Sequence, residues 1–174
     1  MLTQTCTIRN AQPDEYAALG QLMVQVYSQL AGFPKPHEQP TYYHMLANIG
    51  DITAKPGAEL LVAIDGAGKL LGGVVYFRDM QHYGSGGTAT QEQLASGFRL
   101  LAVAPDRQGH GIGKLLTQAC IAKAREHQNK QVIIHSTKAM QTAWGMYERL
   151  GFTRSEDLDF MQGELPVYGF RLQL

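Results

Sequence analysis

Cysteine is scarce in this chain of 174 residues, which contains two of them. Cys6 and Cys120 lie far apart and do not form the C-x-x-C spacing that is typical of metal sites. They therefore indicate reduced thiols of a cytoplasmic protein, and no bound metal is expected. Long apolar runs are missing as well, because nowhere do about eighteen apolar residues follow one another, so no membrane span is expected. The opening MLTQTCTIRNAQ also lacks a basic end followed by an apolar run, which favours a soluble protein.

Charge of one sign is not in excess either. Lys and Arg together number 15, as do Asp and Glu, so the formal net charge is +0. A neutral chain has no overall field that attracts nucleic acid or an anionic membrane, and neither is expected as a partner. Any site for an anion must therefore be local.

The length of 174 residues suffices to bury about 70% of the unfolded surface around one core. It is too short for two domains of ordinary size, so we expect a single domain over residues 1–174. Apolar residues at helical spacing predict helices over residues 13–30, 41–50, 115–124 and 139–150, the last closed by Gly151. Apolar, β-branched runs predict strands over residues 5–9, 59–64, 69–77, 98–104, 131–135 and 167–174.

The turn Asp65-Gly66-Ala67-Gly68 predicts an antiparallel hairpin of the second and third strands. The strands at 98–104 and 131–135 flank a helix, so they form a β-α-β unit and should be parallel. Ligands of such units bind beyond the C-terminal ends of the strands.

Three glycines occupy that place. The stretch VAPDRQGHGIGKLL has glycine at positions 109, 111 and 113, although each glycine costs about 1 kcal/mol relative to alanine inside a helix. A helix N-terminus exposes unpaired N–H groups and a positive partial charge, so it binds phosphate where no Cβ atom prevents close approach. Arg107 and Lys114 add positive charge beside the glycines.

Two other phosphate motifs do not fit. A nucleotide P-loop requires G-x-x-x-x-G-K followed by Ser or Thr, whereas Lys114 is followed by Leu115. A dinucleotide fingerprint requires G-x-G-x-x-G, but here the glycines are spaced two by two. A glycine-rich turn that serves only chain reversal stays open as an alternative.

The pattern that fits is Q-x-x-G-x-G at residues 108–113, after a strand that ends in LLAVAP. Here the sequence resembles the GCN5-related N-acetyltransferase (GNAT) superfamily, whose acetyl-CoA pyrophosphate loop has this pattern. The segment MYERLGF at residues 146–152 resembles the end of that superfamily's fourth helix, and the order of elements matches over nearly the whole chain. The resemblance implies one α/β (in some schemes α+β) domain with a mixed central sheet of about six to seven strands. It also implies helices on both faces of that sheet and parallel fourth and fifth strands that splay apart.

The same resemblance implies where acetyl-CoA, the co-substrate, binds. Backbone groups of Leu101, Ala102 and Val103 would be left for the pantetheine arm, and one N–H there would polarise the thioester carbonyl. The pyrophosphate would lie on the amides of Gln108, Gly109, His110, Gly111, Ile112, Gly113 and Lys114. Family members often carry an asparagine that contacts the pantetheine, where this chain has Met140, and Ser136 or Thr137 are candidate substitutes.

The chemistry of amide formation requires two proton transfers. An amine with a pKa near 10 must lose a proton before it attacks a thioester, and a departing thiolate is helped by a donor such as tyrosine. The resemblance assigns the donor role to Tyr147. The alternative is that Tyr147 only packs, because Met140, Ala143 and Trp144 share its helical face. Four residues stay open as the base or as structural groups: Glu92, His82, Tyr83 and His135.

We therefore expect an acetyl-CoA-dependent N-acetyltransferase that moves an acetyl group to a primary amine by direct attack. A small polar or aromatic amine is favoured as the acceptor, because the two expected acceptor loops carry Tyr42, Tyr43, His44, His82 and Tyr83. An enzyme that acts on a protein N-terminus or lysine, and a non-catalytic acyl-CoA-binding module, stay open as alternatives. A homodimer stays open as the assembly.

Overall fold

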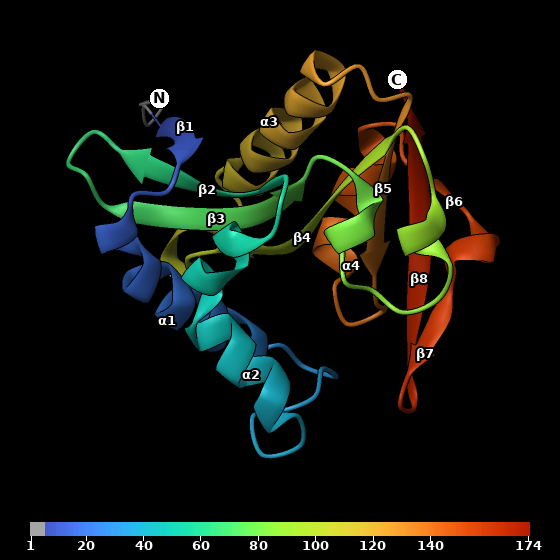
Figure 1. Ribbon diagram of the computed structural model, residues 1–174. Coiled ribbons are helices and arrows are strands. Elements are labelled where there is room, and N and C mark those ends of the chain that lie inside the picture. Colours follow the sequence, from blue (N-terminus) through green and yellow to red (C-terminus); the bar gives the residue numbers. More distant parts are fainter. Residues whose placement is uncertain (1–5) are drawn as a thin grey trace. The chain divides into compact units, whose positions relative to one another are not determined.

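The computed structural model describes residues 6–174, so Thr5, which the sequence places in the first strand, lies outside the described residues. Figure 1 shows strands and helices that follow one another along the chain. The helices are α1 (Tyr16–Ser28), α2 (Pro40–Ala47), α3 (Ile112–Glu126) and α4 (Gln141–Arg149). The strands are β1 (Cys6–Asn10), β2 (Ala58–Asp65), β3 (Leu70–Phe77), β4 (Ala95–Val103), β5 (Gln131–Ser136), β6 (Thr153–Arg154), β7 (Phe160–Gln162) and β8 (Leu165–Gln173).

The strands form a mixed sheet with the order β1-β2-β3-β4-β5-β8-β6, and β7 pairs with β8. β4 and β5 are parallel, whereas β5 and β8 are antiparallel, so the predicted α/β class with a mixed sheet is confirmed. Residues 6–174 contain eight strands where about six to seven were expected. The difference comes from β6 and β7, which have 2 and 3 residues and are too short to show a periodicity.

The described residues divide into two compact units, which we call unit 1 and unit 2. Unit 1 comprises residues 6–54, 59–75 and 100–119, and unit 2 comprises residues 55–58, 76–99 and 120–174. Each unit is described by itself below.

In unit 1, helices cover both faces of β3. Neighbouring residues of a strand point to opposite faces, so Gly72 and Gly73 report on the two sides of the sheet. A Cβ atom on Gly73 would lie 2.5 Å from the side chain of Leu19 in α1, and one on Gly72 would lie 3.3 Å from Ile112 and Leu116 in α3. The expected arrangement of helices on both faces is thus present in this unit (Figure 1).

In unit 2, β5 and β8 pair over six residues, from Gln131↔Gln173 to Ser136↔Tyr168. The rings of Phe98 and Phe152 pack against one another and against Tyr147 of α4, with centroids 5.8 to 6.2 Å apart. The helix ends as predicted, since Gly151 follows it with a φ of +102° and its amide donates to Glu148 O.

The strand β4 is longer and less regular than the sequence indicated. It begins at Ala95 rather than at 98, and it pairs with β5 over its first three residues, Ala95 to Gly97. Leu100 then has a φ of +63°, a left-handed conformation that is uncommon outside glycine and that is typical of a bend or bulge in a strand. Such strained positions often occur at functional sites.

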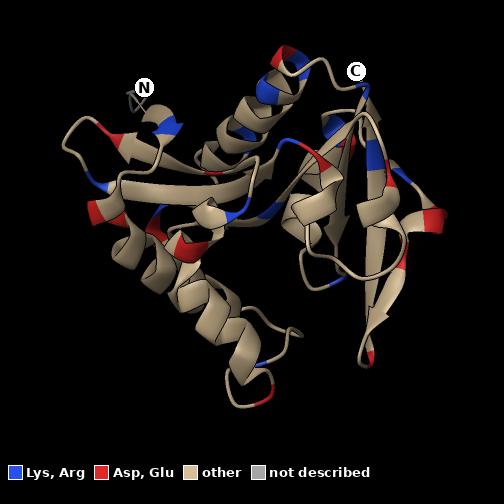
Figure 2. Ribbon diagram, in the orientation of Figure 1, with Lys and Arg blue, Asp and Glu red and all other residues tan. Residues whose placement is uncertain are grey.

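Charges of both signs are interspersed along the elements (Figure 2). Among residues 6–174, no helix is long and apolar enough to cross a lipid bilayer.

Candidate active site

The glycine stretch joins β4 to α3 in unit 1. After a short turn at Pro105–Arg107, the chain passes Gln108 in an extended conformation and enters α3 at Ile112. Gly109 and Gly111 have φ values of +82° and +81°, so both positions favour glycine for backbone reasons. A Cβ atom at either position would meet nothing within 4 Å, so the surface above these two glycines is open. The open surface permits close approach of a ligand, although Gly68 in the turn between β2 and β3 is equally open, so openness alone does not distinguish a binding loop from a turn.

Positive charge lies beside this loop. Lys114 is exposed, and no ion pair of its side chain occurs in the part of the chain that the structure describes. Arg107 Nε is 4.0 Å from Asp106 Oδ2, and Asp106 also accepts a hydrogen bond from Lys69 Nζ at 3.1 Å. That hydrogen bond holds the pKa of Asp106 below its usual value. Lys114 is thus the cation beside the loop that is left for a phosphate.

The backbone of β4 is partly engaged by side chains of unit 1. The hydroxyl of Tyr27 in α1 donates to Leu101 O at 2.8 Å, and Gln108 Nε2 donates a long hydrogen bond of 3.4 Å to Val103 O. A carbonyl oxygen has two lone pairs, so Leu101 O can accept one further donor. The sequence analysis did not single out Tyr27, because it lies within the predicted helix at residues 13–30 and belongs to no motif.

In unit 2, the ring of Tyr147 packs in the core, and its hydroxyl forms no hydrogen bond with a described residue. Its side chain is buried, and its ring contacts Phe98 and Phe152 edge-on. No described residue forms a hydrogen bond with the hydroxyl. Burial raises the pKa of Tyr147 above its ordinary value, so the phenol stays protonated at neutral pH. The packing alternative therefore explains the position of the ring but does not explain why this residue carries a hydroxyl group.

Two further hydroxyls lack a partner at the end of β5. Ser136 and Thr137 are 2% and 4% exposed, and neither side-chain oxygen has a hydrogen-bond partner among residues 6–174. A buried hydroxyl without a partner is unfavourable by roughly 1–3 kcal/mol, so the pair fits a polar group that the protein itself does not supply. Met140 donates its backbone amide to Thr137 O at 3.0 Å, and its thioether cannot replace the amide of an asparagine.

The model of the Acetyltransferase (GNAT) family matches residues 22–152 of the sequence. That segment is most of the chain. The protein belongs to the GNAT family.

Curated relatives and solved structures agree with this assignment. Two proteins named mycothiol acetyltransferase, from Arthrobacter sp. (strain FB24) and Pseudarthrobacter chlorophenolicus, are each 33% identical over 106 residues. Each match covers 61% of this chain but 30% of the relative, so the chain matches less than a third of the length of these proteins.

The fold is shared with solved acetyltransferase structures. A GNAT acetyltransferase from Staphylococcus aureus Mu50 has a TM-score of 0.74 at 16% identity, with 98% of this chain and 99% of that chain covered. The acetyltransferase yncA from Salmonella typhimurium, solved with its cofactor acetyl-CoA, has a TM-score of 0.68 at 17% identity, with 98% and 94% covered.

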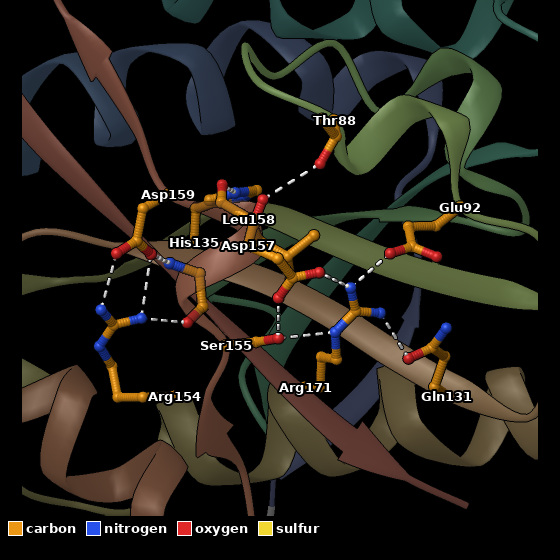
Figure 3. A network of polar contacts seen from close by, with 11 residues as sticks. Thr88, Glu92, Gln131, His135, Arg154, Ser155, Asp157, Leu158, Asp159 and Arg171 are labelled. Carbon is orange, nitrogen blue, oxygen red and sulfur yellow. Dashed lines mark hydrogen bonds and ion pairs between the residues drawn. The ribbon is translucent and has the colours of Figure 1, made fainter.

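For this GNAT protein, three of the four base candidates are engaged in contacts of unit 2. Glu92 forms an ion pair with the guanidinium of Arg171 (Figure 3). His135 Nε2 lies 2.9 Å from Leu158 O, which can only accept, so this nitrogen carries the proton. His135 Nδ1 is then the acceptor of the Tyr83 hydroxyl at 3.0 Å. Burial lowers the pKa of His135, which favours this neutral form.

The contacts of Arg171 join several segments around β8. Nε donates to Ser155 Oγ at 2.7 Å, Nη1 donates to Gln131 Oε1 at 2.9 Å, and Nη2 is also paired with Asp157. Figure 3 shows the guanidinium enclosed by these side chains. We conclude that Glu92 has a structural contact here, and that His82, in the turn Met80–His82, is the candidate left without a described side-chain contact.

Proposed function

We propose that the protein is an N-acetyltransferase that takes the acetyl group from acetyl-CoA and transfers it to the primary amine of a small molecule. The observation that carries this proposal is the open glycine loop at the N-terminus of α3, in a chain of the GNAT family. We further propose that residues 1–174 act as one acetyltransferase domain in the cytoplasm. The cysteines Cys6 and Cys120, which form no disulfide in the described structure, are consistent with that compartment.

The residues of the loop fit a pyrophosphate. The amides of Gln108 to Lys114 would bind it, because the glycines leave their backbone uncovered and the helix N-terminus favours negative charge. The backbone of Leu101, Ala102 and Val103 would bind the pantetheine arm. The hydroxyls of Ser136 and Thr137 would supply side-chain hydrogen bonds to the arm, in place of the asparagine that the chain lacks.

When bound, acetyl-CoA supplies a thioester carbonyl carbon that an amine nitrogen attacks and a sulfur that leaves with the electrons of the C–S bond. A backbone N–H of the segment Leu101 to Val103 would polarise the carbonyl oxygen. Tyr147 would donate its hydroxyl proton toward the leaving sulfur. Burial raises the pKa of Tyr147 and makes the phenol a weaker acid than a free tyrosine, so its hydroxyl would stabilise the leaving sulfur chiefly by donating a hydrogen bond.

Replacement of Gly111 by valine tests the cofactor site directly. The Gly111→Val side chain would cover the amides at the start of α3, so the affinity for acetyl-CoA should fall about tenfold or more. Gly68→Val is the matched control, because Gly68 lies in the same unit, has a φ of +82° and also has nothing within 4 Å of its Cβ position. Calorimetric titration of both folded variants with acetyl-CoA gives the measurement.

An unchanged affinity in a folded Gly111→Val variant would contradict the placement, as would an equal loss in Gly68→Val. Release of free CoA thiol with a panel of amines tests transfer. Tight binding of acetyl-CoA without turnover of any amine would favour the acyl-CoA-binding module instead.

A further inference from the structure

A second cluster of positive charge lies in unit 2, around Gly84. This residue follows the turn Met80–His82 and has a φ of +77°. A Cβ atom on Gly84 would lie 3.1 Å from Nη1 of Arg99 and 3.8 Å from Nζ of Lys55. The two nitrogens are therefore within about 7 Å of each other, a distance at which two positive charges repel.

The Nη1 atom of Arg99 is held by hydrogen bonds, whereas its Nε and Nη2 atoms are not. Its Nη1 donates to Tyr83 O at 3.0 Å and to Gly84 O at 3.3 Å, and its guanidinium lies 5.7 Å from the centre of the Tyr83 ring. Its Nε and Nη2 form no hydrogen bond with any described residue, and they are not among the fully buried atoms. Three N–H donors are thus fixed in direction and open to a ligand.

Arg99 differs from the other half-buried arginines in having no carboxylate partner. Each of those has a carboxylate oxygen within 4.0 Å: Arg9 has Glu15, Arg107 has Asp106, Arg154 has Asp159, and Arg171 has Glu92 and Asp157. Within residues 6–174, neither Arg99 nor Lys55 forms an ion pair. The carboxylate of Asp79, in the loop after β3, accepts the amide of Gln81 at 3.0 Å and forms no ion pair with a described residue. The protein therefore brings two cations together without supplying their counterion.

We propose that Arg99 and Lys55 bind an anionic group, a carboxylate or a phosphate, of the acceptor amine. The adjacent Nε–H and Nη2–H groups of a guanidinium match two oxygens of such a group, and the lysine adds a second charge. Arg99 precedes Leu101 by two residues in β4, and Leu101 begins the segment proposed to hold the thioester. The inference rests on the proposed acetyltransferase function and narrows its acceptor to amines that carry a negative charge.

The experiment compares amines with and without an anionic group, at a pH above the pKa of both amines so that each is present as the free base. Amino acids that have a primary amine and an uncharged side chain are assayed beside their amides, and O-phosphoethanolamine is assayed beside ethanolamine, with CoA release as the rate. The wild-type protein should show a kcat/KM about tenfold or more higher for the charged member of at least one pair, as expected for a charged hydrogen bond. The amino-acid and phosphate arms distinguish a carboxylate from a phosphate. Saturation-transfer NMR with the same compounds, without acetyl-CoA, measures binding independently of turnover.

Three variants assign the preference to the cluster. Arg99→Gln and Lys55→Gln should each reduce the charged-to-neutral ratio about tenfold through KM and leave the neutral amine and the acetyl-CoA affinity unchanged. Arg125→Gln, which removes an exposed cation from the last turn of α3 in the same unit, is the matched control. Lys55→Gln leaves both carbonyl contacts of Arg99 intact, so it decides the matter if Arg99→Gln does not fold.

Equal rates and equal binding for the charged and neutral members would overturn the inference. A preference that survives in both cluster variants, or that is lost equally in Arg125→Gln, would also overturn it. Loss of the acetyltransferase function has a different signature, namely no acetyl-CoA affinity and no CoA release with any amine, and the NMR arm then still reports on the anion site.

Discussion

Two glycine-rich loops of this protein use the same residue type for opposite purposes. In the loop at residues 108–114, Gly109 and Gly111 have open space where a Cβ atom would be. In the loop at residues 84–87, a Cβ atom on Gly86 would lie 2.8 Å from the ring of Phe160, and one on Gly87 would lie 3.4 Å from the same residue. The first loop leaves its backbone uncovered, as the proposed pyrophosphate site requires, and the second lets other parts of the protein approach closely. Composition alone does not separate the two cases, whereas the contacts do.

The largest effect is expected on kcat, from a residue that lies in neither loop. If the loop at 108–114 binds acetyl-CoA but takes no part in the chemistry, the rate should depend on a side chain elsewhere, and Tyr147 has the unused hydroxyl. Tyr147→Phe keeps the ring contacts with Phe98 and Phe152 and should lower kcat by a factor on the order of 10² to 10⁴. Acetyl-CoA affinity and the melting temperature should change little.

Tyr168→Phe is the matched control, because the Tyr168 hydroxyl also has no hydrogen bond with a described residue but belongs to β8. It should keep the wild-type kcat. If Tyr147→Phe turns over within about twofold of the parent while chemistry limits the rate, Tyr147 is a packing residue.

A smaller effect, on the free energy of unfolding, is expected when a side chain is added in the loop at residues 84–87. Gly86→Ala places a methyl group 2.8 Å from Phe160, which must shift, so the free energy of unfolding should fall by about 1–3 kcal/mol. Gly66→Ala is the control, since Gly66 has nothing within 4 Å of its Cβ position and no positive φ. Urea denaturation of both variants gives the comparison. Equal stability of the two variants would mean that the loop at 84–87 is not packed as described.

The smallest effect is expected on the melting temperature, from a change in the turn between β2 and β3. This turn also contains glycines, and the carboxylate of Asp65 stabilises it by hydrogen bonds. Asp65 Oδ1 accepts the amides of Ala67 and Lys69 at 2.9 and 2.8 Å, and the hydrogen bond from Lys69 holds the pKa of Asp65 below its usual value. A carboxyl whose pKa is lower in the folded state stabilises the fold above its unfolded pKa of about 3.9, and this contribution is lost as the pH falls through the folded value.

Asp65→Asn should therefore lower the melting temperature slightly at pH 7 and have no effect at a pH below the folded pKa. Thermal melts of both proteins across this range give the measurement. A difference between the two proteins that does not change with pH would contradict the role of the carboxylate.

Local signals predicted much of the fold. The turn at Asp65 to Gly68, the parallel pair of β4 and β5 and the glycine that closes α4 each depend on residues close together in sequence, and all three are confirmed. The left-handed conformation of Leu100 was not predicted, because leucine carries no signal for it and the bend follows from the pairing of the whole strand.

The sequence predicted the part of the candidate site that belongs to a motif. It did not predict contacts between residues that lie far apart in the sequence. The hydrogen bond of Tyr27 to Leu101 O joins residues 74 apart in sequence, and the approach of Lys55 to Arg99 also depends on the folded chain. Glu92 looked available as a base until the structure paired it with Arg171, which lies 79 residues away. Sequence periodicity carries no information about such pairs, since it reports on one element at a time.

Titration of ¹⁵N-labelled protein with acetyl-CoA, followed by NMR, tests the central claim most directly. The account predicts that the amides of Gly109, Gly111 and Gly113 shift strongly, while those of Gly86 and Gly87 in the packed loop do not. Shifts at Gly86 and Gly87 without shifts at residues 108–114, or saturable binding that leaves residues 108–114 unchanged, would contradict it.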